Sequence, residues 1–329
     1  MKKNIAIIAG GDSSEIVVSM KSAQGIHSFI DKEKYNTYIV TIQGGEWLVK
    51  LPNGDESEID KNDFSFVEGF NIKQFHFAYI TIHGTPGEDG KLQGYFDLIG
   101  IPYSTCGTLA AALTFNKYVC NNFLKSFGID VPPSLRILKG ETVEPEKIAA
   151  EFDLPLFVKP NLGGSSFGIS KVKKTKELLP AIEKAFEESN EVLIEKFMQG
   201  TEITCGCYKT KKKTVILPIT EVVSKNEFFD FDAKYNNQSE EITPARISPA
   251  LTEKVQKLTS QIYEIVGAKG IIRIDYIITE KEIVNLLEIN TTPGMTPASF
   301  IPQQVVAAGL YIKDIMTEII ENEMQSTQL

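Results

Sequence analysis

The sequence is poor in the side chains that hold transition metals or form disulfides, with 4 cysteines and 3 histidines among 329 residues. No cysteine pair has CxxC spacing and no histidine cluster accompanies the cysteines, which argues against a zinc centre. We expect free and mostly buried thiols, because unpaired cysteine is among the most often buried residue types. The cysteines are Cys106, Cys120, Cys205 and Cys207.

Long apolar runs are also missing. A membrane-spanning helix needs about 18 consecutive apolar residues, and stretches such as residues 305–312 fall far short of that length. Lys2 and Lys3 precede a short apolar run, but this run ends in Gly10 and Gly11 instead of the cleavage site of a signal peptide. The sequence therefore predicts a cytoplasmic protein that does not act at a membrane.

Positive charge is in deficit, since 34 Lys and Arg face 43 Asp and Glu and the formal net charge is −9. This balance argues against nucleic acid or an anionic membrane as the main partner, although it leaves room for a local basic pocket. The hydrophobic fraction of 42% and the charged fraction of 23% are ordinary for a globular chain. At about 150 residues per domain, the length predicts two domains or three small ones.

Short β-branched runs alternate with segments of helical apolar spacing, which predicts an α/β protein. The elements expected in the amino-terminal part are strands at 4–9, 38–42 and 77–82, a helix from Ile16 to Phe29, and a polar interruption at 52–63. In open parallel sheets, ligands bind beyond the carboxyl ends of the strands. The turns at residues 10–15 and 83–90 are therefore the first candidate binding site.

The same alternation continues beyond residue 104. The expected elements are helices at 108–127, 178–188 and 251–266, strands at 156–159, 169–172 and 192–197, and paired strands at 270–278 and 283–289. A glycine-rich loop at 163–168 follows Lys159, and its N–H groups could cradle a nucleotide phosphate that the lysine neutralises. The loop matches neither GxxxxGK[ST] nor a GxGxxG that opens a helix. Taken alone, it is interpreted equally well as a plain hairpin turn.

Polar and apolar side chains alternate in the two paired strands. Alternation places Arg273 with Asp275 on one face of its strand, and Glu288 with Asn290 on one face of the next. An even number of connecting residues would bring both pairs to the same face, and an odd number would split them. Two carboxylates and an amide oxygen suit Mg²⁺, which often bridges carboxylates and substrate phosphates. Because unpaired polar groups are costly in such an apolar sheet, we favour a functional site over solvated strand faces.

Other candidate positions have ordinary interpretations beside functional ones. Glu15, in the first turn of a helix, could hold a substrate ammonium or simply face the helix dipole. His83 ends a strand, where an isolated histidine is more often a turn or core residue than a catalytic one. Lys234 and Tyr235 lie in a polar loop that is either a lid or a surface excursion. The Pro-Gly turn within residues 290–296 can bring N–H groups close to a ligand.

Four segments together carry a family resemblance: residues 10–15 (Gly-Gly-Asp-Ser-Ser-Glu), 83–90 (His-Gly-Thr-Pro-Gly-Glu-Asp-Gly), 270–275 (Gly-Ile-Ile-Arg-Ile-Asp) and 287–296 (Leu-Glu-Ile-Asn-Thr-Thr-Pro-Gly-Met-Thr). They resemble the amino-terminal and carboxy-terminal signatures of the D-alanine:D-alanine ligases of the ATP-grasp superfamily. The resemblance runs from Ile5 to about Leu310. The chain departs from the family pattern at Phe300, where an aliphatic residue is common, and at residues 161–163 before Gly164.

The resemblance implies an α/β fold with a three-domain ATP-grasp architecture, in which ATP is held between two antiparallel sheets. It implies an amino-terminal parallel α/β domain for substrate binding at residues 1–104. A central ATP-grasp domain at 105–196 and a carboxy-terminal ATP-grasp and metal-binding domain at 197–329 would follow.

The resemblance also implies a role for each matching residue. Implied ATP ligands are Lys117 and Lys159 at the phosphates, Glu195, Lys196 and Met198 around the adenine, Glu202 at the ribose, and Lys234. Implied ligands of two Mg²⁺ (or Mn²⁺) ions are Asp275, Glu288 and Asn290. Implied catalytic residues are Glu15 at the ammonium of the first D-alanine, Ser165 and Tyr235 hydrogen-bonded beside it, and Arg273 at an oxyanion. Implied substrate-binding residues are His83, Gly294, Ser299 and Phe300.

The activity so implied is ATP-dependent ligation of two D-alanine molecules through an acyl phosphate, for peptidoglycan precursors, by a homodimer. One alternative is a ligase that joins D-alanine to D-lactate, or another ATP-grasp ligase of a carboxylate and an amine. A third alternative is a nucleotide-binding regulatory module that has lost turnover. Loss of a metal carboxylate or of Arg273 would favour that module, and the sequence keeps all of them.

Overall fold

The computed structural model describes residues 2–164, 167–224 and 239–326. These residues form three sheets with helices packed against them. Within this described part of the chain, no helix combines the length and the apolar character needed to cross a membrane. All four cysteines are free and buried, as the composition predicts.

The amino-terminal sheet has the strand order β6-β5-β4-β3-β2-β1-β7. Its parallel part consists of β1 (Lys3–Gly10), β2 (Tyr35–Gln43) and β7 (Phe77–Ile80). The antiparallel extension consists of β3 (Glu46–Lys50), β4 (Glu56–Asp60), β5 (Ser65–Glu68) and β6 (Asn71–Gln74). Helices α1 (Ile16–Phe29) and α2 (Lys91–Ile99) follow β1 and β7 along the chain. The expected strands and helix are confirmed.

The polar interruption expected at 52–63 is wrong in part, because β4 runs through it. Backbone hydrogen bonds to β3 and β5 hold this strand, and Ile59 is its buried apolar anchor. Acidic side chains point outward around it, so the segment lacks the apolar content by which strands are recognised.

Two helices, α3 (Thr108–Phe115) and α4 (Lys117–Lys125), occupy the segment expected as one helix. The break is at Asn116, whose backbone is extended and whose side chain accepts a hydrogen bond from the Val119 N–H. Asparagine at such a position caps the second helix. The break also places Lys117 in the first turn of α4, where its side chain reaches the central cleft.

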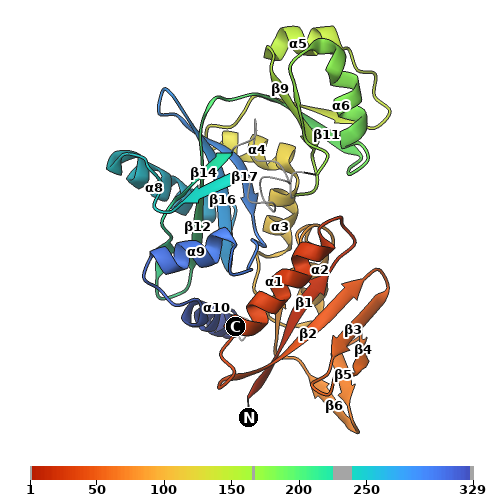
Figure 1. Ribbon diagram of the computed structural model, residues 1–329. Helices are drawn as coiled ribbons and strands as arrows, with labels where there is room; N and C mark the ends of the chain where they lie inside the picture. Colours follow the sequence, from red (N-terminus) through yellow and green to blue (C-terminus); the bar gives the residue numbers. More distant parts are fainter. Residues whose placement is uncertain (1, 165–166, 225–238, 327–329) are drawn as a thin grey trace.

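The second sheet is antiparallel, with the order β10-β9-β11-β8. It contains β8 (Ser134–Leu138), β9 (Leu156–Pro160), β10 (Ser170–Val172) and β11 (Glu191–Lys196). Helices α5 (Pro145–Phe152) and α6 (Leu178–Ala185) pack on it through a shared apolar cluster. Figure 1 shows this small layer above the amino-terminal part.

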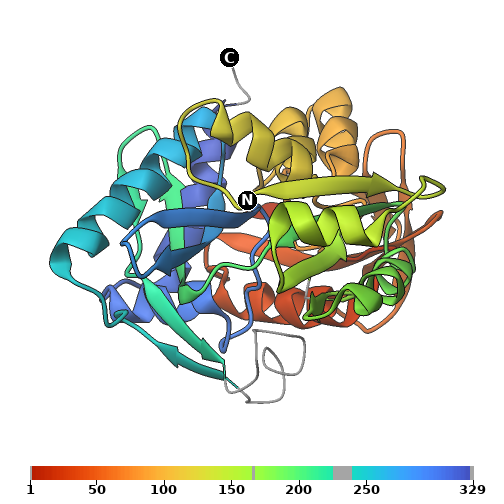
Figure 2. The same cartoon turned by 90° about the horizontal axis from the view of Figure 1, so that it is seen from above.

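The third sheet carries the carboxy-terminal candidates. Its main path is β15-β14-β12-β16-β17, with β13 (Thr214–Ile216) also paired to β12 (Gly200–Lys209). The other strands are β14 (Thr220–Ser224), β15 (Ser239–Ile242), β16 (Ile271–Thr279) and β17 (Val284–Asn290). The helices described in this part are α8 (Pro249–Ile265), α9 (Phe300–Ala307) and α10 (Ile312–Ser326). Viewed from above, the third sheet lies toward the left of the molecule and the second sheet toward the right (Figure 2).

The register between β16 and β17 settles which side chains share a face. Arg273 lies opposite Asn290, and Asp275 lies opposite Glu288, so all four side chains project to one side. Beyond Asp275 the register shifts by one, because Tyr276 pairs with Leu286 and Leu287 is an extra residue on β17. Without this bulge, Leu287 would face Asp275 and Glu288 would point to the opposite side.

Candidate active site

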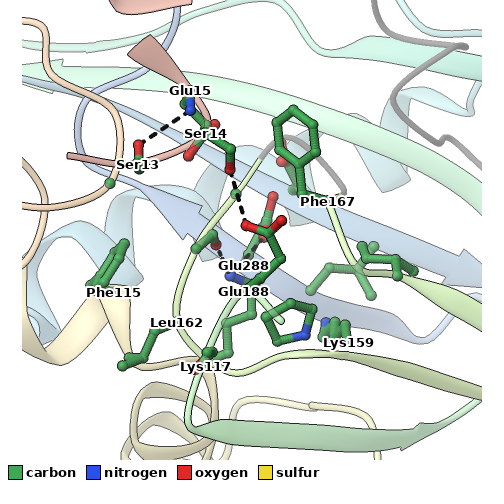
Figure 3. A pocket seen from close by; sticks show the side chains of 18 of the residues that line it. Ser13, Ser14, Glu15, Phe115, Lys117, Lys159, Leu162, Phe167, Glu188 and Glu288 are labelled. Carbon is green, nitrogen blue, oxygen red and sulfur yellow. Dashed lines mark hydrogen bonds and ion pairs between the residues drawn. The ribbon is translucent and has the colours of Figure 1, made fainter. Parts of the chain in front are cut away.

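A cleft of about 780 Å³ lies where the three sheets approach one another. Among the residues assigned functional roles from the sequence, its lining includes Glu15, Lys117, Lys159, Glu195, Glu202, Arg273, Asp275, Glu288 and Phe300. Figure 3 shows four of these side chains, those of Glu15, Lys117, Lys159 and Glu288, around the same space. Residues from all parts of the chain therefore meet in one cavity.

The turns after β1 and β7 meet at the first wall of the cleft. The hydroxyl of Ser13 donates to the His83 carbonyl at 2.8 Å and accepts from the Glu15 N–H at 3.3 Å. This contact agrees with the expectation that turns at the carboxyl ends of neighbouring parallel strands form one site. Glu15 is only 5% exposed. A Cβ on Gly164 would lie 3.0 Å from both carboxylate oxygens of Glu15, so Gly164 lies directly against that carboxylate.

His83 and Glu88 flank this wall. Burial lowers the pKa of His83, Arg273 lowers it further, and Glu15 opposes the shift. Nε2 of His83 lies 3.5 Å from the hydroxyl of Ser22. The Glu88 carboxylate accepts a hydrogen bond from the Gly84 N–H at 2.7 Å. Burial and the nearby Glu15 raise the pKa of Glu88. Sequence reasoning gave Glu88 no role, although the residue lies within the 83–90 segment.

Two lysines supply positive charge to the cleft. Lys159, on β9, forms a 2.7 Å ion pair with Glu195, on β11, and both side chains are almost fully buried. The second carboxylate oxygen of Glu195, Oε1, has no hydrogen-bond partner among the described residues. Lys117 donates to the Gly163 carbonyl and lies 3.7 Å from Oε2 of Glu288. The glycine-rich loop is thus tied to α4 and, through Lys117, to the third sheet.

The Asp275 carboxylate accepts hydrogen bonds from three side chains of the third sheet. Arg273 donates to both of its oxygens, from Nε at 2.9 Å and from Nη2 at 2.8 Å. Asn290 donates to Oδ2 at 3.0 Å, and the hydroxyl of Thr204 donates to Oδ1 at 2.5 Å. These bonds fix the carboxylate in one orientation. Thr204 lies on β12, and nothing in the sequence pattern marked it as a functional residue.

The oxygen donors beside Arg273 have the chemistry of a magnesium site. Asp275 and Glu288 supply carboxylates and Asn290 supplies an amide oxygen, which are the ligand types that hard divalent cations prefer. No group of three or more His, Cys, Asp or Glu that could hold a metal ion occurs among the residues that the structure describes. The predicted set, with two carboxylates and one amide, does not require such a group.

The remaining sequence-predicted residues lie around or away from the cleft. Ser299 precedes α9, and its hydroxyl accepts from the Thr296 N–H at 3.1 Å and lies close to where a Cβ on Gly294 would be. The Phe300 ring centre lies 5.3 Å from the guanidinium carbon of Arg273. His83, Lys196, Met198, Asn290, Gly294 and Ser299 are not among the described residues that line the cleft. Ser165, Lys234 and Tyr235 lie outside the described residues.

Profiles of one protein family match most of the chain. The profile described as D-ala D-ala ligase N-terminus matches residues 4–106. The profile described as D-ala D-ala ligase C-terminus matches residues 123–321.

Individual relatives agree with the profiles. A D-alanine–D-alanine ligase of Bacteroides fragilis strain YCH46 is 65% identical over 323 residues, which are 98% of this chain and 100% of the relative. The corresponding ligase of Porphyromonas gingivalis strain W83 is 56% identical over the full length of both chains.

Solved structures extend the likeness to three dimensions. A D-Ala:D-Ser ligase from Enterococcus faecalis, VanG, superposes with a TM-score of 0.86 at 30% identity and covers 98% of this chain and 100% of its own. A D-alanine–D-alanine ligase from Bacillus anthracis complexed with ATP superposes with a TM-score of 0.79 at 30% identity, covering 99% of both chains. These likenesses span all three sheets.

Proposed function

The chain belongs to the D-alanine–D-alanine ligase family, and we propose that the cleft carries out this family's reaction with the residues described above. The protein is an ATP-using ligase with the ATP-grasp fold, and it joins two D-alanine molecules into D-alanyl-D-alanine for peptidoglycan synthesis. One observation supports the residue assignments most strongly. The bulge at Leu287 brings Asp275, Glu288, Arg273 and Asn290 to one face of the sheet. Three of these residues, Arg273, Asp275 and Glu288, line the same cleft as Glu15.

The nucleotide fits between the second and third sheets. Glu195 Oε1 is a buried acceptor without a partner among the described residues, and an acceptor so buried is costly unless a ligand donates to it. The exocyclic amine of adenine is such a donor. Lys159 and Lys117 supply the positive charge that the phosphates need. In the same proposal Lys196 and Met198 border the adenine.

The ribose, the phosphates and the metal ions have further proposed ligands. Glu202, on β12, lines the cleft and would hold the ribose. Lys234 would contact the phosphates. Asp275, Glu288 and Asn290 would hold two Mg²⁺ (or Mn²⁺) ions. When bound, these ions offset charge on the transferring phosphoryl group.

In this proposal the first D-alanine is held with its ammonium against Glu15 and with His83 nearby. Ser165 and Tyr235, which lie outside the described residues, would form hydrogen bonds beside that carboxylate. A carboxylate oxygen of this D-alanine attacks the γ-phosphorus of ATP, and ADP leaves, so the product of the first step is D-alanyl phosphate. This acyl phosphate makes the carboxyl carbon reactive towards an amine.

The second D-alanine is held by Ser299, the backbone of Gly294 and the ring of Phe300. Its ammonium first loses a proton, the free amine attacks the acyl carbon, and phosphate leaves as the peptide bond forms. Arg273 faces the oxyanion of the tetrahedral intermediate, where a fixed positive charge stabilises the transition state more than the ground state.

We propose that the chain is divided at residues 104 and 196 into the three domains of an ATP-grasp ligase. We further propose a homodimer located in the cytoplasm, where ATP is available. Sedimentation of the purified protein would test the dimer.

Product analysis tests the proposed second substrate. We expect equal D-alanine and D-lactate at neutral to alkaline pH to yield mainly the dipeptide, because the amine becomes a stronger competitor as it loses its proton. Tyr235→Phe should loosen this choice. The lactate alternative is less favoured, since curated relatives at 56% to 65% identity are D-alanine–D-alanine ligases. D-alanyl-D-lactate as the main wild-type product above pH 7, measured by mass spectrometry, would contradict the proposal.

A further inference from the structure

Helix α9 carries a buried glutamine whose amide has hydrogen-bond partners on both sides. Gln304 is fully buried. Its Oε1 accepts from the Gly206 N–H at 3.0 Å, and its Nε2 donates to the Thr204 carbonyl at 3.0 Å and to the Thr220 hydroxyl at 3.1 Å. A buried amide with this many partners is held in a single orientation.

The amide fills a gap at the edge of β12. The pairing of β12 with β14 ends where Thr204 lies opposite Thr220, and its pairing with β13 begins only at Cys207. Between these points, the Thr204 carbonyl and the Gly206 N–H need partners, because unpaired buried backbone groups are costly. The single amide of Gln304 serves both groups, as the peptide group of a neighbouring strand would.

The fit leaves no room for a side chain at residue 206. A Cβ on Gly206 would lie 2.7 Å from Oε1 of Gln304 and 2.6 Å from Cδ1 of Ile301. Side chains of helix α9 therefore lie directly against the backbone of strand β12 at this point. The amide of Gln304 and the lack of a side chain at Gly206 together fix this approach of the helix to the strand.

Each end of this contact leads to a different part of the proposed site. On the β12 side, the Thr204 hydroxyl donates to Oδ1 of Asp275, one of the proposed metal ligands. On the α9 side, the helix begins at Phe300, whose ring lies over Arg273, and Ser299 immediately precedes it. Gln304 thus joins the helix that presents the second-substrate residues to the strand that orients the metal carboxylate.

We propose that Gln304 is a positioning residue for the second D-alanine. It sets the distance from Ser299 and Phe300, at the start of α9, to the Arg273–Asp275 pair on the sheet. This inference rests on the roles proposed above for those residues. Without the amide, α9 keeps its apolar packing through Ile301 and Val305 but loses its polar attachment to β12. A displacement of about 1 Å at a reacting group can cost as much as a hundredfold in rate.

The test uses the full chain with Gln304→Met, which keeps side-chain length and removes all three hydrogen bonds. Gln304→Glu is the second variant, since a protonated carboxyl can still accept from one side and donate to the other. Thr259→Val is the matched control, because Thr259 is also fully buried in the same part of the chain and bonds the Tyr276 hydroxyl at 2.9 Å, away from α9. Steady-state phosphate release gives separate KM values for ATP and for each D-alanine, and thermal unfolding gives Tm.

We expect Gln304→Met to raise the KM of the second D-alanine about tenfold or more, with the KM values of ATP and the first D-alanine within about twofold of wild type. The second-site KM of Gln304→Glu should approach that of the wild type as the pH falls, because protonation of the new carboxyl group restores a hydrogen-bond donor. Thr259→Val should lower Tm without changing any KM. The inference would be overturned if a folded Gln304 variant had a second-site KM within about twofold of wild type. Gln304 would then have a purely structural role.

Ser299→Ala, measured beside these variants, separates this inference from the function on which it rests. If Ser299→Ala changes neither D-alanine KM, the assignment of α9 to the second substrate is wrong. If it raises the second-site KM and the Gln304 variants do not, only the inference about Gln304 is wrong.

Discussion

Replacing Glu288 with alanine should separate activity from stability more sharply than any other change at the cleft. Glu288 on β17 lies opposite Asp275 on the neighbouring strand β16. It is proposed to hold metal ions beside the transferring phosphoryl group. Its backbone pairing does not depend on the carboxylate. We therefore expect Glu288→Ala to fold like the wild type and to lose nearly all turnover.

Glu288 forms a long ion pair with Lys117, and Lys117 also donates a hydrogen bond to the Gly163 carbonyl. Lys117 Nζ lies 3.7 Å from Oε2, and the two side chains are 11% and 26% exposed. Lys117 therefore keeps a hydrogen-bond partner when the carboxylate is removed, and we expect the loss of stability to be small beside the loss of turnover. Removing a negative charge close to Glu88 offsets part of this loss, since Glu288 contributes to the raised pKa of Glu88.

The expected loss of activity is larger. Removing one group that stabilises charge in the transition state typically lowers kcat by about 10²-fold or more, and a hundredfold corresponds to about 2.7 kcal/mol of transition-state stabilisation. Phosphate release at saturating ATP, D-alanine and Mg²⁺ measures this loss, and thermal unfolding measures stability. Glu253→Ala is the control, because it removes a 2.6 Å ion pair with Lys257 on the exposed face of α8. A Glu288→Ala protein with near-normal kcat at saturating Mg²⁺ would refute the metal assignment.

Two further predictions concern charge at the cleft. Arg273→Lys keeps the positive charge but loses the planar guanidinium that bonds both oxygens of Asp275. We therefore expect kcat to fall by a larger factor than the KM of D-alanine rises. A raised KM with unchanged kcat would instead assign Arg273 to substrate binding. Burial and the nearby Glu15 raise the pKa of Glu88 above its ordinary 4.5. Between these two pKa values Glu88 keeps its proton in the folded protein and releases it in the unfolded chain. The free energy of unfolding therefore falls as the pH rises from 4.5 through the folded-state pKa. Glu88→Gln keeps an acceptor for the Gly84 N–H and should flatten this decline in Tm, whereas parallel Tm profiles of variant and wild type would show that Glu88 does not titrate in this way.

Sequence patterns predicted the site where regular geometry determines it. The meeting of the 10–15 and 83–90 turns follows from the rule for parallel strands, and the contact through Ser13 agrees with it. Alternation correctly paired Arg273 with Asp275 and Glu288 with Asn290. Whether both pairs share a face depended on the connection, and the answer came from the bulge at Leu287, which alternation alone does not reveal.

Features that depend on tertiary contacts had no sequence signal. The break at Asn116 is an exception with a local signal, because asparagine is a preferred helix N-cap and here caps the Val119 N–H. By contrast, β4 is held by its neighbouring strands despite its acidic side chains. Thr204 and Gln304 become functional candidates only because folding brings β12 between β16 and α9. Residues of this kind act through a partner that is distant in sequence, so no local spacing identifies them.

In the reaction proposed for this cleft, one D-alanine becomes an acyl phosphate before the peptide bond forms. Turnover with D-alanine labelled with ¹⁸O in its carboxylate, followed by mass spectrometry of the released phosphate, tests it directly. An acyl phosphate passes one carboxylate oxygen to phosphorus, and attack by the second amine then breaks the carbon–oxygen bond, so we predict that the released phosphate carries one ¹⁸O. Phosphate without label, or label found in AMP, would contradict the account.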